Sequence, residues 1–113
     1  MQFKKLSETF AVAPQIGASD VSAIAAAGYR SIICNRPDGE APDQPPFAEI
    51  AAEARAQGLA VSHVPVISGM VTENDVAGFD AAVASLPSPV LAYCRSGARC
   101  TTLWSMSSLG KKR

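Results

Sequence analysis

The chain has 113 residues, a length that suits a single domain whose core needs neither a metal nor disulfides for support. Its ten basic and ten acidic side chains cancel, so no overall field would recruit nucleic acid or an anionic membrane. A hydrophobic content of 48% argues against disorder, and no apolar run is long enough to span a bilayer. We therefore expect one globular domain, residues 1–113, whose partners are neither nucleic acids nor membranes.

The three cysteines cannot all pair with one another, and the first ten residues lack the apolar core of a secretory signal. A reducing, cytoplasmic location is the corresponding expectation.

Strand patterns and helix patterns alternate along the chain. An edge strand is predicted near residues 3–6, and the remaining strands are predicted at residues 10–13, 29–33, 59–66 and from 90 onward. Helices are predicted from Ser19 or Asp20 to Ala27, over 46–57, over 72–86 and from about Cys100 or Thr101. Short links between such units give parallel strands. The predicted fold class is α/β, a three-layer sandwich with a central, mostly parallel sheet of four to five strands and helices on both faces.

The residues best suited to catalysis or anion binding lie in the segment 90–104, where a predicted strand ends at Cys94 and a predicted helix follows a short loop. Gly97 lets the loop turn its N–H groups inward, and the guanidinium of Arg99 can donate two hydrogen bonds to an oxyanion. A thiol beside such donors is held as thiolate, the nucleophilic form. Cys94 and Arg99 are thus the candidate catalytic residues, and the candidate anion-binding residues are Arg95, Ser96, Gly97, Ala98 and Cys100.

Loops at the carboxyl ends of neighbouring parallel strands meet at one edge of a sheet. This places the candidate pocket wall after two other strands, at Cys34, Asn35, Arg36, Ser68, Gly69 and Met70. The second of these loops has no carboxylate before Glu73 and Asp75. The single histidine, His63, is expected to be structural.

Three segments resemble one family: residues 28–40, which hold Asn35-Arg36-Pro37-Asp38-Gly39-Glu40, then Val64-Pro65-Val66, then Cys94-Arg95-Ser96-Gly97-Ala98-Arg99. The family is the phosphatase-like domain of the bacterial beta-lactamase-hydrolase-like proteins, related to dual-specificity phosphatases. The resemblance implies a cysteine-phosphatase-like fold, a cysteinyl-phosphate intermediate, and neither metal nor cofactor.

Position by position, the resemblance implies that Cys94 is the nucleophile and Arg99 the residue that binds the transferred group. Backbone N–H donors would come from residues 96–98, and Asn35 and Arg36 would shape the pocket wall. Phosphatases supply a general acid from the loop after the strand that corresponds to residues 59–66, so Glu73 and Asp75 are the candidate general acids that the resemblance implies. Cys34 stands where some dual-specificity relatives form a protective disulfide. Relatives continue with further helix after the loop, so the domain is expected to be shortened at its C-terminus.

Three functions remain open at this stage. The first is a cysteine-dependent hydrolase of phosphate monoesters, acting on a small anionic substrate or a phosphorylated protein. The second is a rhodanese-type sulfurtransferase with a persulfide on Cys94, because four residues separate Cys94 from Arg99 where tyrosine phosphatases have five. The third is a non-catalytic anion-binding or redox-sensing module, in which Cys34 or Cys100 pairs with Cys94. Formation of a homo-oligomer also stays open.

Overall fold

The sheet has five strands: β1 (Lys4–Lys5), β2 (Phe10–Ala13), β3 (Ser31–Cys34), β4 (Ala60–His63) and β5 (Val90–Tyr93). The computed structural model describes residues 3–107, and in it the strand order is β1-β2-β5-β3-β4. Only β1 is antiparallel to its neighbour, whereas β2, β5, β3 and β4 run parallel to one another. The prediction of a mostly parallel sheet is confirmed.

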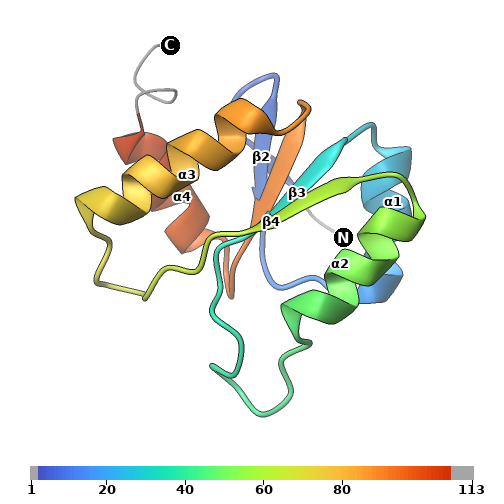
Figure 1. Ribbon diagram of the computed structural model, residues 1–113, viewed down its shortest axis with the longest axis horizontal. Helices are drawn as coiled ribbons and strands as arrows, with labels where there is room; N and C mark the ends of the chain where they lie inside the picture. The colour runs from blue at the N-terminus through green and yellow to red at the C-terminus, as the bar shows by residue number, and fades with distance from the viewer. Residues whose placement is uncertain (1–2, 108–113) are drawn as a thin grey trace.

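Helices cover both faces of this sheet. They are α1 (Val21–Ala26), which follows a 3₁₀ turn over Ala18–Asp20, and α2 (Phe47–Ala56), α3 (Glu73–Ser85) and α4 (Ala98–Met106). As Figure 1 shows, α1 and α2 lie on one side of the strands, and α3 and α4 lie on the other. The result is the predicted three-layer α/β sandwich. None of the helices in residues 3–107 is long and apolar enough to cross a membrane.

Each face of the sheet has its own apolar core. On one face Ile24 and Ile50 pack against Leu91. On the other face the ring of Phe10 stacks on Trp104, with centroids 4.3 Å apart, and meets Phe79 edge-on at 5.6 Å. Successive residues of a strand point to opposite faces, so the side chains of β5 alternate between the two cores.

This alternation decides where the nucleophile candidate points. Leu91 and Tyr93 belong to the core beneath α1 and α2, whereas Ala92 and Cys94 belong to the core beneath α3 and α4. The Cys94 side chain therefore faces α4, the helix that begins four residues later.

The path of the chain brings three loops to one edge of the sheet. The strands β2, β3 and β4 follow one another along the chain, and the chain then returns to place β5 between β2 and β3. The loops after β3, β4 and β5 consequently emerge together, at the lower edge of the sheet in Figure 1. Ligands bind at such a reversal of strand order in open α/β sheets.

Several predicted boundaries differ from the structure; the strand predicted at residues 29–33, for example, spans Ser31–Cys34. The strand predicted at residues 59–66 ends at His63, because Pro65 has no N–H to donate to the ladder. The last helix begins at Ala98 and not near Cys100 or Thr101, so Arg99 and Cys100 lie in its first turn. The chain end at residues 110–113, on which the shortened C-terminus was predicted, lies outside the described residues.

Candidate active site

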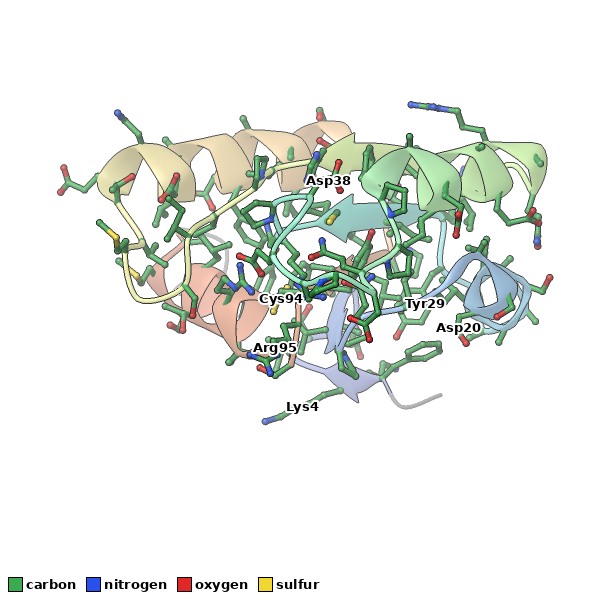
Figure 2. The ribbon with its side chains drawn as sticks, turned by 90° about the horizontal axis from the view of Figure 1, so that it is seen from below. Lys4, Asp20, Tyr29, Asp38, Cys94 and Arg95 are labelled. Carbon is green, nitrogen blue, oxygen red and sulfur yellow. The ribbon has the colours of Figure 1, made fainter. Side chains whose placement is uncertain are left out.

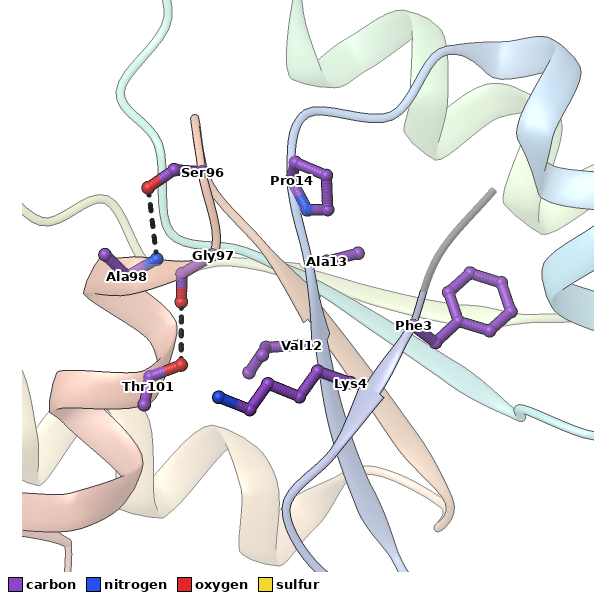
Figure 3. Close-up of a pocket in the computed structure, with 9 residues that line it drawn as sticks. All are labelled: Phe3, Lys4, Val12, Ala13, Pro14, Ser96, Gly97, Ala98 and Thr101. Carbon is purple, nitrogen blue, oxygen red and sulfur yellow. Dashed lines mark hydrogen bonds between the residues drawn. The ribbon is translucent and has the colours of Figure 1, made fainter.

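Gly97 converts the loop after β5 into the start of α4. Its φ of 92° is left-handed, a conformation that glycine adopts without steric cost, and a Cβ here would lie 3.5 Å from the carbonyl oxygen of Ala13. The Gly97 carbonyl accepts hydrogen bonds from the Thr101 amide (3.0 Å) and hydroxyl (2.9 Å), and the Ala98 amide donates to the Ser96 hydroxyl (Figure 3). This turn directs the Gly97 N–H back to Cys94 Sγ, 3.1 Å away.

Cys94 is buried, with 1% of its surface exposed, yet its environment favours the charged thiolate. A hydrogen bond from the Cys100 thiol, together with the backbone N–H groups of Cys100, Arg99 and Gly97, lowers the pKa of Cys94 to about 5, despite the opposing effect of burial. All these donors come from the loop and the amino end of α4, where the helix dipole also stabilises negative charge. At neutral pH the sulfur is therefore a thiolate.

Cys100 is the neutral partner of this thiolate. It is fully buried in the first turn of α4, and burial, followed by the nearby Cys94 thiolate, raises its pKa well above the ordinary value. The two sulfurs thus form a pair in which Cys94 carries the charge and the Cys100 thiol donates a hydrogen bond to it.

Arg99 presents one free edge of its guanidinium. Nη1 donates to Glu40 Oε2 (2.8 Å) and to the Val66 carbonyl (2.9 Å), and Nη2 donates to Glu40 Oε1 (2.9 Å). A guanidinium has five N–H groups, so the Nε–H and one Nη2–H are left without a partner among the described residues. These two parallel donors can bind two oxygens of an anion.

Glu40 links Arg99 to the loop that follows β3. Its Oε1 also accepts a hydrogen bond from Arg36 Nε at 2.9 Å, and Arg36 Nη1 in turn donates to Gln15 Oε1 at 2.9 Å. The hydrogen bonds from Arg99, and then from Arg36, lower the pKa of Glu40. The same carboxylate raises the pKa of Arg99, so both groups stay charged.

An open cleft of about 1040 Å³ lies over this cluster. In Figure 2 Cys94 and Arg95 lie close to the loop that carries Asp38, below the two long helices. The residues that line the cleft come from four loops and are mostly polar: Gln15, Arg36, Glu40, Ala41, Pro42, Asp43, Gln44, Pro45, Ser68, Arg95, Ser96, Ala98 and Arg99. Of the residues predicted for the site, the structure brings Arg36, Ser68, Arg95, Ser96, Ala98 and Arg99 to this cleft, whereas Cys94, Gly97 and Cys100 are buried and do not line it.

Four predicted pocket-wall residues lie outside the cleft lining. Cys34 and Asn35 are buried beneath it: the Cys34 thiol donates to the Arg36 carbonyl, and the Asn35 side-chain amide donates to the Val64 carbonyl. Burial raises the pKa of Cys34. Met70 is 66% exposed, and Gly69 lines a separate pocket of about 330 Å³ beside Arg99. The sequence predicted which loops meet at this edge of the sheet, but not the directions of these side chains.

The structure does not bring either predicted general acid to the cleft. Asp75 caps α3, since its carboxylate accepts the Thr72 N–H at 2.9 Å while the Thr72 hydroxyl accepts the Asp75 N–H. Glu73 occupies the exposed first turn of the same helix. Both carboxylates therefore stand at a helix start, where negative charge is stabilising, and neither lines the cleft.

His63 and Tyr93 support the site without lining it. His63 Nε2 lies 3.0 Å from the Arg36 carbonyl oxygen, and its ring stacks on Phe47 at 4.6 Å. Tyr93, which precedes Cys94, points into the opposite core, and burial raises its pKa. The part of the chain that the structure describes has no cluster of three or more His, Cys, Asp or Glu side chains suited to a metal ion.

Sequence reasoning missed Glu40, Asp43 and Gln15. Glu40 lies 59 residues before Arg99, so the ion pair has no local signal. A signal did exist in the spacing of Arg36 and Glu40 within the segment that carried the family resemblance.

A family model described as "Beta-lactamase hydrolase-like protein, phosphatase-like domain" matches residues 2–111. The chain is 39% identical over 109 residues to a beta-lactamase hydrolase-like protein from Xylella fastidiosa (strain Temecula1 / ATCC 700964), covering 96% of this chain and 25% of that protein. It is 35% identical over 104 residues to one from Agrobacterium fabrum, covering 92% and 24%. The chain thus spans about a quarter of the length of these curated relatives.

Solved structures show the same architecture. A crystal structure from Neisseria meningitidis, provisionally described as a phosphatase, is 40% identical with a TM-score of 0.87, covering 93% of this chain and 75% of that one. The core catalytic domain of an S. cerevisiae PP-IP phosphatase, in complex with citrate, is 14% identical with a TM-score of 0.70, covering 89% and 60%. P. aeruginosa TpbA in complex with pTyr is 15% identical with a TM-score of 0.70, covering 92% and 60%. The last two likenesses establish a cysteine-phosphatase-like fold.

Proposed function

Because the chain belongs to the phosphatase-like domain family of the beta-lactamase hydrolase-like proteins, we propose that it is a cysteine-dependent phosphatase that cleaves phosphate monoesters through a cysteinyl-phosphate intermediate. The observation that carries the proposal is the Cys94 thiolate at the amino end of α4, next to an Arg99 guanidinium whose Nε edge is free. In the proposed reaction Cys94 supplies the nucleophile, and Arg99 supplies hydrogen-bond donors for the equatorial oxygens of the phosphoryl group.

In the proposed reaction the Cys94 thiolate attacks phosphorus opposite the ester oxygen. Arg99 binds two of the three equatorial oxygens through Nε and Nη2, and the N–H groups of the loop stabilise the charge that develops there. The fixed Glu40 carboxylate holds the guanidinium ready, so little reorganisation is needed when the charge forms. Water then attacks the cysteinyl phosphate and releases inorganic phosphate.

The lining of the cleft supports a small, polar phosphate ester as substrate. None of the described residues that line it is aromatic, so no ring is present to stack on a phenyl leaving group. The exposed Arg95 side chain is a further cation at the rim. The polar, cationic lining therefore suits transfer of a phosphoryl group to Cys94 from a small, anionic substrate better than it suits recognition of an aromatic side chain.

A sulfurtransferase is the second candidate, and the length of the loop favours it. Only four residues separate Cys94 from Arg99, which suits a smaller transferred group than a phosphoryl group. A persulfide on Cys94 would be stabilised by the same N–H donors as the thiolate. Sulfur transfer to a thiol acceptor needs no general acid.

One comparison separates the two candidates. Wild type, Cys94→Ser and Cys34→Ser are incubated with an aryl phosphate or with thiosulfate, and the products are measured as phosphate, thiocyanate after addition of cyanide, and added mass on the Cys94 peptide. Phosphate release with a transient phosphate adduct, lost in Cys94→Ser and kept in Cys34→Ser, supports the phosphatase. Cys34 is the matched control because it is a buried cysteine whose side chain belongs to the opposite core from Cys94. Thiocyanate release with one added sulfur and no phosphate would overturn it.

A further inference from the structure

We propose that Asp43 is the general acid of the reaction, the group that protonates the leaving oxygen as the bond to phosphorus breaks. The inference rests on the proposed phosphatase function. It assigns the proton transfer to the loop after β3, and not to the segment after β4 that the sequence suggested.

The carboxylates that line the cleft are few. Among the described residues they are Glu40 and Asp43 alone. Both oxygens of Glu40 accept hydrogen bonds from guanidinium groups, Oε1 from Arg36 and Arg99 and Oε2 from Arg99, so a proton there would have to displace an ion pair. Asp43 makes no hydrogen bond or ion pair with any residue in the described part of the chain, and its exposed side chain lines the cleft.

The other acidic side chains near this edge accept hydrogen bonds at helix starts or lie outside the cleft. Asp38 Oδ1 accepts the Phe47 N–H at 2.9 Å, at the start of α2, and does not line the cleft. Asp75 is bound in the cap of α3, and Glu73 lies in the same first turn. Proton transfer requires a carboxyl group beside the ester oxygen, and of the two described carboxylates that line the cleft with Arg99, Asp43 is the one that no guanidinium binds.

The loop that carries Asp43 is held in a defined place. The Gln44 side chain, adjacent to Asp43, donates to the Pro37 carbonyl at 2.9 Å and accepts the Glu40 N–H at 3.0 Å, which closes the loop on itself. Glu40 then fixes this closed loop to Arg99 with two hydrogen bonds. The same residue thus orients the guanidinium and positions the loop that presents the acid.

The proposed step balances in protons and bonds. As the S–P bond forms and the P–O bond breaks, the Asp43 proton moves to the ester oxygen, which leaves as an alcohol, and Asp43 becomes a carboxylate. In the second step this carboxylate takes a proton from the attacking water, the S–P bond breaks, and Cys94 returns to the thiolate with Asp43 again protonated. With such an acid in place, substrates with a basic alkoxide leaving group are within reach.

The test compares leaving groups. Wild type, Asp43→Asn and Glu73→Gln are assayed with phenyl phosphate, whose leaving group needs a proton, and with dinitrophenyl phosphate, whose leaving group does not. We expect Asp43→Asn to lower kcat with phenyl phosphate by about 100-fold, the low end of what general acid catalysis supplies, and to leave dinitrophenyl phosphate hydrolysis almost unchanged. Glu73→Gln, an exposed carboxylate outside the cleft, should match wild type with both substrates.

Three results would contradict the assignment of Asp43, and one further variant serves as a control. Equal activity of Asp43→Asn and wild type with both esters removes Asp43 from the reaction and leaves the phosphatase intact. An equal loss with both esters, in a variant with the thermal unfolding midpoint of wild type, shows a role in binding and not in protonation. Asp43→Glu keeps a carboxyl group, and it should restore part of the phenyl phosphate activity. If wild type cleaves neither ester in a manner that depends on Cys94, the proposed function and this inference both fail.

Discussion

The carboxylate of Glu40 binds the guanidinium of Arg99 in parallel, with Oε2 2.8 Å from Nη1 and Oε1 2.9 Å from Nη2. The Arg99 side chain is 8% exposed and that of Glu40 27%, so the pair lies at the floor of the cleft and not on its rim. This contact leaves the Nε edge of Arg99 for an anion.

Replacing Glu40 by Gln is expected to lower kcat/KM for an aryl phosphate by about 10-fold or more, since charge-assisted hydrogen bonds of this kind are worth about 1.5–3 kcal/mol. The amide keeps the shape but holds Arg99 less firmly. Affinity for vanadate, which binds the same oxyanion donors, should fall in parallel. Glu49→Gln, an exposed substitution in α2, serves as the control. Unchanged vanadate affinity in Glu40→Gln would show that Arg99 is positioned without it.

Cys100→Ala is expected to raise the pKa of Cys94 by roughly 1, because a hydrogen bond to a charged group of this strength is lost. Cys100→Ser keeps a hydroxyl donor and should leave that pKa close to the wild-type value. The measurement is the rate of alkylation of Cys94 by iodoacetamide as a function of pH. Identical profiles for wild type and Cys100→Ala would mean that the backbone N–H groups alone stabilise the thiolate.

Cys94 is expected to make stability depend on pH. Its pKa is about 5 in the folded chain, and the thiol of an unfolded chain has the ordinary value of roughly 8.5. Between these values the unfolded chain binds more protons, so the stabilisation is complete above the upper value and is lost as the pH falls through the lower one. Urea unfolding of wild type and Cys94→Ser should show a difference in free energy that grows with pH across this window. A constant difference would contradict the low pKa.

Gly97→Ala is expected to destabilise the fold by about 1–2 kcal/mol, the cost of a left-handed residue with a Cβ, and to abolish thiolate stabilisation by moving the loop. Gly78→Ala is the matched control. Gly78 lies inside α3 with an ordinary helical φ, and a Cβ there meets nothing nearer than Val64 at 4.0 Å. This variant should be more stable than wild type by about 0.5–1 kcal/mol. Chemical denaturation measures the change in the free energy of unfolding in each variant. A change of the same sign in Gly97→Ala and Gly78→Ala would refute the argument.

Peroxide is expected to join Cys94 to Cys100 and not to Cys34. The thiolate is oxidised to a sulfenic acid, which condenses with a neighbouring thiol and releases water. Cys100 lies on the same face of the sheet as Cys94, whereas the Cys34 side chain belongs to the opposite core. Peptide mapping after mild oxidation identifies the pair, and a Cys34–Cys94 peptide as the main product would contradict this reading. In Cys100→Ser the sulfenic acid should persist long enough to be trapped.

The sequence predicted the fold well because its signals are local. The apolar strand that ends at Cys94 and the Gly97 turn determine the nucleophile loop, and neither depends on distant residues. The directions of loop side chains could not be predicted in the same way. The order of the strands predicted which loops meet. It did not predict that the Asn35 side chain points inward to Val64 while the Met70 side chain is exposed. Only contacts across the loops decide such directions.

The general acid shows a different limit. Glu73 and Asp75 were the first carboxylates after the strand that ends at His63, yet Thr72 and Asp75 also form the pattern of a helix cap, and the cap is what the structure uses. Glu40 has only the four-residue spacing from Arg36 as a local signal, and Asp43 has none. Their significance arises from the fold, which places the loop after β3 against an arginine almost sixty residues further along the chain.

The place of β5 has a consequence for how substrate preference could diverge in this family. The strand that ends at the nucleophile hydrogen-bonds to β2 on one side and to β3 on the other, so its end cannot slide without disrupting two ladders at once. The backbone that carries the Cys94 sulfur is therefore held in a fixed position by both neighbouring strands. Any change in the molecules accepted must come from the surrounding rim, where positions such as Ala41, Pro42 and Pro45 can exchange side chains while Cys94, Arg99 and Asp43 stay as they are.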